Sequence, residues 1–388
     1  MFGLFLLLTL YRIRCCATLF LNVERGFNSM NQLKESYQHA QYSFAQHGER
    51  NVGVLKEVFA QIPAETKSDM YGSGEGIEAF QEKMATILGK EASVFFPSGT
   101  MAQQIALRLW SDQQGSKQVA YHPLSHLEIH EQDGLRALHQ LEPLLVGDAQ
   151  RLITLADVQA LPETVACLLL ELPQREIGGQ LPDFVELEAI AAYCKEKGII
   201  LHLDGARLWE CLPYYQKTAA EVCALFDSVY VSFYKGLGGI AGAILAGSAD
   251  FVAEAKVWKR RHGGDLISLY PYVLSADYYY EQRIEKMPVY YQGAQMLAAK
   301  FNECPAVHTL PEVPVTNMFH VHFAKSLTEM TDILVKLQVE TGIGATGNLK
   351  EIDETHCSFE LSVGDQLGMI PSNQLDNWFV RLAQLLHV

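Results

Sequence analysis

The feature that most constrains the fold is an alternation, between residues 92 and 246, of short apolar runs with longer amphipathic segments. The apolar runs carry few charges, which is typical of strands that are buried on both faces of a sheet. We expect six strands: Ala92–Phe96, Gln118–Tyr121, Val165–Leu172, Ile199–Leu203, Ser228–Phe233 and Gly242–Ala246. Helical periodicity lies between several of them, as in Met101–Trp110 and in Phe184–Lys197, which Gly198 ends. Strands that alternate with helices predict an α/β fold with a mainly parallel sheet.

The pattern changes after about Tyr280. Shorter strand-like and helical segments follow, which predict a smaller α+β domain. They are the strand-like Val315–Phe323 and Ser358–Val363 and the helical Leu327–Thr341 and Gln374–Leu386. We therefore expect a large domain over residues 30–285, including a helical N-terminal segment, and a small domain over residues 286–388.

The first 29 residues are a separate question. The apolar run Phe2–Tyr11 is shorter than the roughly 20 residues that span a membrane, and Arg12 and Arg14 follow it, whereas a signal peptide begins with its basic residues. Two interpretations are open: a weak export or anchoring segment, or sequence upstream of a start at Met30. We favour the second, because a polar helical pattern begins at Met30. Residues 1–29 are then expected to lie outside any domain, and no membrane partner is expected.

Charge and cysteine content exclude some functions. Lys and Arg total 30 against 45 Asp and Glu, a formal net charge of −15, so nucleic acid is not expected as a partner. The eight cysteines are scattered and show no zinc-ligand spacing. We therefore expect buried, reduced thiols in a cytoplasmic protein with no metal site.

Polar residues that directly follow apolar runs deserve the closest reading, because α/β sheets bind ligands at the carboxyl ends of their strands. The first such segment is Phe-Pro-Ser-Gly-Thr at residues 96–100. Ser98, Gly99 and Thr100 open a helix there, so that backbone N–H groups, the positive end of the helix dipole and a hydroxyl group converge. This predicts an anion site; the alternative is a plain capping turn, with Ser98 or Thr100 as the cap.

The second segment is Leu-His-Leu-Asp-Gly-Ala-Arg at residues 201–207. Asp204 ends an apolar strand, where a carboxylate is costly unless a cation or a hydrogen-bond donor meets it. A structural salt bridge to Arg207 is one interpretation. The other is a carboxylate that faces the protonated ring nitrogen of a bound cofactor.

The third segment is Ser-Phe-Tyr-Lys-Gly-Leu-Gly-Gly at residues 232–239. Lys235 follows a buried strand, and limited access to water lowers the pKa of an amine toward its neutral form, which a Schiff base requires. A surface lysine beside a turn is the alternative. A dinucleotide-binding loop, and with it a nicotinamide oxidoreductase, is disfavoured, because Ala241 stands where the third glycine belongs.

The fourth segment holds three histidines spaced by four residues, His122, His126 and His130, which would line one face of a helix. The order of a metalloprotease zinc motif is absent. A histidine that stacks on a planar ligand, or one satisfied in the core, is the favoured interpretation.

Together the four segments supply an anion-binding helix start, a buried carboxylate, an amine nucleophile and an imidazole. These are the parts that a pyridoxal 5′-phosphate (PLP) site requires. With Ser-His-Leu-Glu-Ile-His-Glu at residues 125–131, they resemble the threonine aldolase/β-eliminating lyase family of fold-type I PLP enzymes in order and spacing, from about Tyr71 to Gly264. The resemblance implies a large PLP-dependent transferase-like domain and a smaller C-terminal one.

The resemblance also implies roles for single residues. Lys235 would form the Schiff base with PLP, Asp204 would pair with the pyridine nitrogen, and Arg207 would lie near the ring oxygen or the substrate carboxylate. Gly99 and Thr100 would hold the phosphate. His126 would stack on the ring and help to move protons.

The chain departs from the family pattern in places that concern the substrate. No Ser-Asp-Thr element precedes Met70, Glu360 stands where aldolases commonly have an arginine for the substrate carboxylate, and Arg175 stands where they usually have an asparagine. Recognition of the carboxylate is therefore expected to be rebuilt, with Arg175 or Arg207 as its residue.

The function implied is retro-aldol cleavage of a small β-hydroxy-α-amino acid, of the threonine or allo-threonine type, to glycine and an aldehyde. Two alternatives are β-elimination on the same fold and a catalytically diverged member with a binding or regulatory role. A homodimer or homotetramer is implied by the resemblance alone. Residues 259–264 resemble a family segment near a subunit interface, although a solvated basic turn is an equally good interpretation.

Overall fold

The structure is a computed structural model that describes residues 31–387. The predictions for residues 1–29 lie outside this range. The chain divides into two compact units. The larger comprises residues 49–295 and 314–318, and the smaller comprises residues 31–48, 296–313 and 319–387. Within residues 31–387, no helix combines the length and the apolar character that a membrane span needs.

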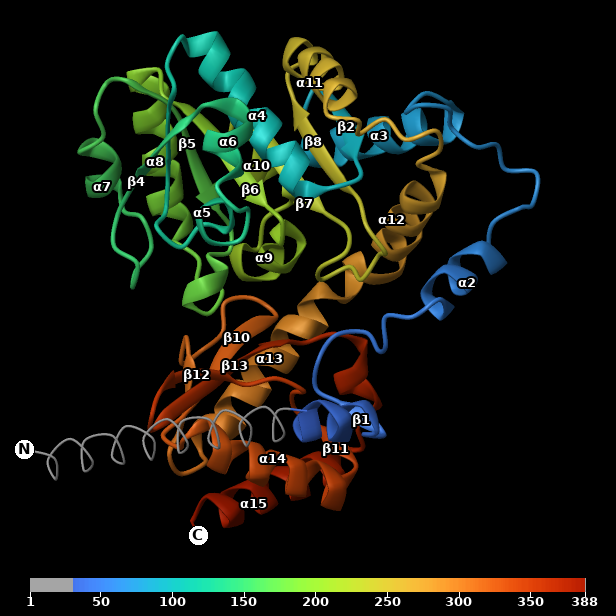
Figure 1. Cartoon of the computed structure of the whole chain (residues 1–388), viewed down its shortest axis with the longest axis vertical. Helices are drawn as coiled ribbons and strands as arrows, with labels where there is room; N and C mark the ends of the chain where they lie inside the picture. The colour runs from blue at the N-terminus through green and yellow to red at the C-terminus, as the bar shows by residue number, and fades with distance from the viewer. Residues whose placement is uncertain (1–30, 388) are drawn as a thin grey trace, which may run out of the picture. The chain divides into compact units, whose positions relative to one another are not determined.

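The larger unit is built on a seven-stranded sheet in the order β2-β8-β7-β6-β5-β3-β4 (Figure 1). Neighbouring strands are parallel except where β8 is involved, since β8 is antiparallel to both β2 and β7. The strands are β2 (Ala92–Phe96), β3 (Gln118–Tyr121), β4 (Glu142–Leu145), β5 (Val165–Glu171), β6 (Ile200–Gly205), β7 (Ser228–Ser232) and β8 (Ala243–Gly247). The predicted α/β fold with a mainly parallel sheet is thereby confirmed.

Helices cover both faces of this sheet, as two adjacent residues of β2 show. Successive side chains of a strand point to opposite faces. Phe96 belongs to an apolar cluster with residues of α4 (Gly99–Gln114) and α11 (Ala249–Arg261), whereas Phe95 contacts Phe80 of α3 (Glu75–Leu88), with ring centroids 6.1 Å apart. The other helices are α2 (Gly53–Ala60), α5 (His126–Ile129), α6 (Gly134–His139), α7 (Leu155–Gln159), α8 (Phe184–Lys197), α9 (Leu208–Tyr215), α10 (Ala219–Cys223), α12 (Tyr270–Arg283) and the 3₁₀ turns η1 (Arg175–Ile177) and η2 (Ile284–Lys286).

The six predicted strands correspond to β2, β3, β5, β6, β7 and β8, with ends that agree to within two residues. Strand β4 is the one that the sequence did not predict. It lies at the edge of the sheet, is only partly buried and contains Pro143, which cannot donate to a ladder. Its pattern therefore lacks the continuous apolar run of a central strand.

The smaller unit contains a four-stranded sheet in the order β12-β13-β10-β9. Its elements are β9 (Val307–Leu310), β10 (Met318–Phe323), β12 (Lys350–Asp353), β13 (His356–Ser362), α14 (Leu327–Thr341), η3 (Asp365–Met369) and α15 (Ser372–Leu386). Helix α13 (Met287–Asn302) begins in the larger unit and ends in the smaller one. A smaller unit with both helices and a sheet agrees with the α+β prediction.

The observed grouping differs from the predicted boundaries at the N-terminal side. We expected the helical segment from residue 30 to belong to the large domain, but residues 31–48 belong to the smaller unit. The reason is that β1 (Tyr42–Ser43) pairs in parallel with β11 (Ile343–Gly344), and the fully buried Phe44 contacts Trp378, with ring centroids 4.7 Å apart. A helical period does not reveal such a long-range partner.

Candidate active site

Neighbouring strands carry the predicted site residues to one edge of the larger sheet. The strand register pairs Glu171 of β5 with Asp204 of β6, and Asp204 with Tyr230 of β7. Lys235 follows the end of β7 by three residues, and Gly99 follows the end of β2 by three. Because β2 and β7 are both antiparallel to β8, they run in the same direction. These residues therefore share the carboxyl edge, at which α/β sheets bind ligands.

Asp204 is a buried carboxyl group at that edge, with 3% of the residue exposed. Its Oδ1 accepts a hydrogen bond from the backbone N–H of Ala206 at 3.0 Å. Burial raises the pKa of Asp204, and the positive charge of Lys235 acts against this rise. A cation brought next to Asp204 would therefore be strongly stabilised.

Lys235 has the environment of a reactive amine. Burial, and then the positive charge of Arg207, lower the pKa of Lys235 to about 8 against the attraction of nearby carboxyl groups. Those groups are Asp204, Glu171 and Glu210. A substantial fraction of the amine is thus neutral, and nucleophilic, just above neutral pH.

The turn after Lys235 is held by Glu210 of α9, a residue that the sequence did not single out. Its Oε1 accepts a hydrogen bond from the backbone N–H of Gly236 at 3.0 Å. A Cβ on Gly236 would lie 2.1 Å from the same oxygen, so a larger residue would displace the Glu210 side chain from this contact. The contact fixes the backbone that presents the Lys235 amine.

The start of α4 is open at the position predicted to bind an anion. Ser98 is the N-cap residue but makes no side-chain capping hydrogen bond, so the first N–H groups of the helix are not satisfied by it. Gly99 lies against the hydroxyl group of Tyr230, since a Cβ on Gly99 would lie 2.0 Å from Tyr230 Oη. An acceptor with negative charge suits this helix end.

His126 begins α5 and is fixed by a buried carboxylate. Its Nδ1 lies 3.1 Å from Oε1 of Glu131, whose side chain is 2% exposed. Oε2 of Glu131 accepts a hydrogen bond from Nε2 of Gln104 at 2.8 Å. The backbone N–H of His126 donates to Oε2 of Glu171 at 3.4 Å.

The three histidines do not line one helix, because α5 contains only His126 of the three. His122 lies before it and is buried, with Nε2 at 3.0 and 2.9 Å from the carbonyl oxygens of Asp148 and Arg151. His122 is therefore a core histidine. Among residues 31–387, no group of three or more potential ligands could hold a metal ion.

The two arginines proposed for the substrate carboxylate belong to the same unit. Arg207 is the N-cap residue of α9, and its charge acts on Lys235. The backbone N–H of Arg175 donates to Oε1 of Glu171 at 3.4 Å, and its Nη1 donates to Oε1 of Glu176 at 3.3 Å. Glu171 thus contacts both the segment of His126 and the segment of Arg175.

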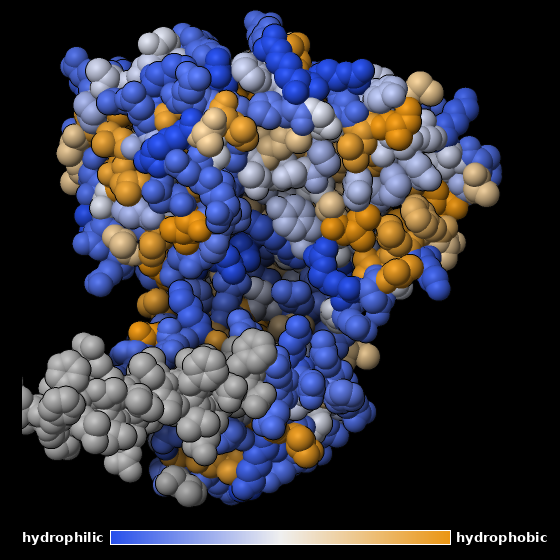
Figure 2. Space-filling view, in the orientation of Figure 1, coloured by the Kyte–Doolittle hydropathy of each residue, from blue (hydrophilic) through white to orange (hydrophobic). Residues whose placement is uncertain are grey.

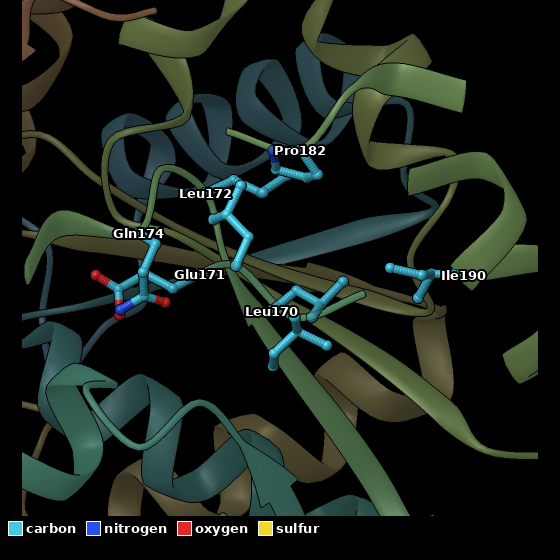
Figure 3. A pocket seen from close by; sticks show the side chains of 8 residues that line it. Leu170, Glu171, Leu172, Gln174, Pro182 and Ile190 are labelled. Atoms are coloured by element: carbon cyan, nitrogen blue, oxygen red, sulfur yellow. The ribbon is translucent and has the colours of Figure 1, made fainter. Parts of the chain in front are cut away.

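A small cavity adjoins Glu171, with a volume of about 20 Å³. In Figure 3 the polar ends of Glu171 and Gln174 lie together, on the side away from Ile190. Leu170 and Leu172 are among its apolar lining residues. A cavity of this size holds about one water molecule and no cofactor.

Sequence reasoning missed Glu171, Glu131, Gln104, Glu210 and Tyr230. Glu171 could have been predicted as a site residue, because it directly follows the apolar residues of one strand, much as Asp204 stands near the end of the next. Glu131 and Gln104 meet only through the packing of α4 on the loop after α5. No local pattern marks such a contact.

Comparison with known proteins assigns the family. The profile described as beta-eliminating lyase matches residues 56–326. This chain belongs to that family. It is 25% identical to low-specificity L-threonine aldolase 1 of Arabidopsis thaliana over 296 aligned residues. The alignment covers 73% of this chain and 82% of the relative.

Two solved structures resemble this lyase over most of its length. A Listeria monocytogenes protein, provisionally assigned as an L-allo-threonine aldolase, has a TM-score of 0.91 and 60% identity and covers 92% of this chain and 99% of that chain. An Exiguobacterium protein, provisionally assigned as an aromatic amino acid beta-eliminating lyase/threonine aldolase, has a TM-score of 0.90 and 58% identity, with coverage of 91% and 99%. The predicted family, fold type and PLP dependence are confirmed.

The residues of the larger unit fit PLP. The open start of α4 suits its phosphate, the buried carboxyl group of Asp204 suits a protonated ring nitrogen, and the partly neutral amine of Lys235 suits its aldehyde. Each group is otherwise costly or unsatisfied, so the cofactor would stabilise the site.

Glu360 lies in the smaller unit, on β13. Its Oε2 is 3.8 Å from Nε2 of His320 on β10. The correspondence of Glu360 to the substrate-binding arginine of aldolases stays a prediction.

Proposed function

We propose that this lyase catalyses retro-aldol cleavage of a β-hydroxy-α-amino acid of the threonine or allo-threonine type, giving glycine and an aldehyde. The observation that carries the proposal is the grouping of the Lys235 amine with the buried carboxyl group of Asp204 at one sheet edge. The names of similar proteins, threonine aldolases among them, support the substrate class. When bound, PLP supplies an electron sink for the pair released as the Cα–Cβ bond breaks.

Different residues of the chain have different proposed roles toward the cofactor and the substrate. Lys235 would hold the cofactor through its amine, and Asp204 would face its ring nitrogen and favour the protonated form, which accepts electrons more readily. Gly99 and Thr100, at the start of α4, would hold the phosphate through helix N–H groups. His126 would stack on the ring and accept a proton from the substrate.

Arg175 and Arg207 are the candidates for the substrate carboxylate. The charge of Arg207 acts on Lys235, and the backbone N–H of Arg175 donates to Glu171, which lies opposite Asp204. A planar guanidinium can bind a carboxylate through two hydrogen bonds. The substrate would thereby be oriented with its Cα next to the amine of Lys235.

The test combines a spectrum with product analysis. The purified protein is incubated with threonine, allo-threonine and phenylserine, and glycine and aldehyde are measured. We expect a yellow protein whose band is bleached by borohydride and is absent in Lys235→Ala, and aldehyde formation that Lys235→Ala abolishes. A colourless protein after PLP addition, or a yellow one that releases no glycine from any of these substrates, would contradict the proposal.

β-Elimination is the second candidate reaction, favoured by the name of the Exiguobacterium relative. Incubation with cysteine derivatives then yields pyruvate and ammonia, whereas aldol cleavage yields glycine and aldehyde. A member that binds PLP but releases neither set of products would have a binding or regulatory role.

The proposed oligomeric state is a homodimer or a homotetramer. Two loops of the larger unit lie side by side, since the N–H of Tyr71 donates to the carbonyl oxygen of Ile267 at 3.2 Å. These loops and the first residue of α12 expose a set of large apolar side chains: Met70, Tyr71, Leu266, Ile267 and Tyr270, each 37–67% exposed. Figure 2 shows orange, apolar side chains on the right of the larger unit. Such a patch favours burial against a second copy, which light scattering of the purified protein tests.

The proposed location is the cytoplasm. The six cysteines within residues 31–387, all of them buried, are free thiols, and a reducing compartment keeps thiols in this state.

A further inference from the structure

Glu131 is a buried carboxylate for which the proposed function has no role. Its side chain is 2% exposed, and both oxygens have partners: Nδ1 of His126 at 3.1 Å and Nε2 of Gln104 at 2.8 Å. Gln104 lies in the second turn of α4, the helix that begins at Gly99. Gly134 leaves room for its amide, because a Cβ there would lie 2.4 Å from Gln104 Nε2. Glu131 is therefore tied to the helix that carries the proposed phosphate site.

The contact determines which nitrogen of His126 carries hydrogen. An ionised carboxylate only accepts hydrogen bonds, so Nδ1 of His126 must donate. Nε2 of the neutral ring is then left with its lone pair. The His126 side chain is 36% exposed, and Nε2 makes no hydrogen bond within the described residues, so this lone pair is not taken up by another side chain.

The other contacts of His126 do not set the tautomer. Its ring lies 5.0 Å from the ring of His130, centroid to centroid, and its backbone N–H donates to Glu171. Both hold the residue in place, but neither is a hydrogen bond to a ring nitrogen. Glu131 alone makes such a bond within the described residues.

We propose that Glu131 is a positioning residue whose carboxylate fixes the orientation and tautomer of His126, so that Nε2 is the proton acceptor in the lyase reaction. The inference rests on the proposed role of His126 in proton transfer. In the reaction, the proton of the substrate's β-hydroxyl group passes to Nε2, and the electron pair of the O–H bond forms the carbonyl of the aldehyde product as the Cα–Cβ bond breaks and its electron pair leaves with the glycine fragment. The imidazolium ion that results is stabilised by the charge of Glu131.

The experiment observes the His126 ring directly. The holoenzyme is labelled with ¹⁵N-histidine, and the His126 signals are identified by their loss in His126→Phe. Glu131→Ala and Glu131→Gln are compared with Glu128→Gln, a matched control on α5 whose carboxylate accepts from the hydroxyl group of Tyr121 at 2.8 Å. We expect the Nδ1–H tautomer in the wild type and in Glu128→Gln, and a shift toward the Nε2–H tautomer in Glu131→Ala.

Kinetics give the second readout. We expect kcat to fall about 10- to 100-fold in both Glu131 variants with little change in KM, because the base is misoriented while substrate contacts persist. Thermal unfolding and PLP binding close to those of the wild type exclude a loss of folding. If Glu131→Ala keeps the wild-type tautomer of His126, the inference is overturned.

The two proposals fail in different ways. If His126→Phe retains the wild-type kcat, His126 moves no proton and the proposed role is wrong, even where Glu131 sets the tautomer. If His126→Phe loses activity while Glu131→Ala retains both tautomer and kcat, only the inference about Glu131 is wrong.

Discussion

Glu171 and Asp204 lie opposite each other on the neighbouring parallel strands β5 and β6, so that their side chains project from the same face of the sheet. Burial, and after it the charge of Asp204, raise the pKa of Glu171 to about 7. Two adjacent carboxyl groups resist simultaneous ionisation. Near neutral pH the pair therefore shares negative charge that the amine of Lys235 partly balances.

This pair predicts a pH dependence of stability. The unfolded chain releases the proton of Glu171 near its ordinary pKa of 4.5, whereas the folded chain keeps it until about pH 7. The free energy of unfolding should therefore fall as the pH rises through this window. In Glu171→Gln the fall should be smaller, by about 1–3 kcal/mol. Urea unfolding of the cofactor-free protein at pH 5 and pH 8 measures it.

Glu188→Gln, an exposed position of α8, is the control for this substitution. We expect its unfolding to follow the wild type at both pH values. An equal loss of stability between pH 5 and pH 8 in Glu171→Gln and the wild type would show that Glu171 ionises as in the unfolded chain.

The lowered pKa of Lys235 predicts how the rate of PLP binding depends on pH. Because its pKa is lowered to about 8, the rate at which the cofactor-free protein takes up PLP should rise with pH to a plateau above about pH 8. Arg207→Gln removes a positive charge that lowers this pKa, so the midpoint should move to higher pH. Stopped-flow absorbance measures the rate. Arg108→Gln, whose guanidinium pairs with Asp112 on α4, should leave the midpoint unchanged.

The contact of Gly99 with Tyr230 predicts a steric clash that a second substitution relieves in part. In Gly99→Ala the new Cβ would lie 2.0 Å from Tyr230 Oη and 2.6 Å from the ring carbon that bears it. We expect a loss of about 1–3 kcal/mol in the free energy of unfolding and weaker PLP binding. Tyr230→Phe removes the nearer atom, so the double variant should regain part of the loss. A double-mutant cycle with no coupling energy would refute the contact.

Much of the sheet and its edge follows from sequence because the information is local. The apolar run of β6 ends at Asp204, and the run of β7 is followed by Lys235, so the burial of the strand and the placement of the polar group are visible together. Their convergence then follows from the parallel direction of the strands. Strand β4 could not be recognised in this way, because it contains Pro143 and is only partly buried, so its sequence lacks a continuous apolar run.

The supporting contacts could not be predicted from sequence. Glu131 meets Gln104, 27 residues earlier, only after α4 has packed on the sheet. His122 shares the spacing of His126, yet it lies outside α5 and bonds to backbone carbonyl groups. Spacing by four residues carries meaning only where a helix actually forms, and here it covers one histidine of three.

Substitution of Phe44 tests whether residues 31–48 pack as part of the smaller unit. Its ring is fully buried and lies 4.7 Å from that of Trp378 and 6.0 Å from that of Phe379. Phe44→Ala should therefore lower the free energy of unfolding by about 3–5 kcal/mol. Val52→Ala, which is 68% exposed, should cost less than about 0.5 kcal/mol. An equally small cost in both, measured by urea unfolding, would argue against the grouping.

Arg175 tests how the substrate carboxylate is recognised. Its guanidinium shares Glu176 with His130, whose Nε2 lies 3.0 Å from the same Oε1. A lost hydrogen bond between charged groups costs about 1.5–3 kcal/mol, so Arg175→Ala should raise KM for the amino acid about 10- to 100-fold and change kcat little. Arg136→Ala, an exposed arginine that pairs with Asp133, is the control and should leave KM unchanged. An unchanged KM in Arg175→Ala would remove this residue and leave Arg207 as the candidate.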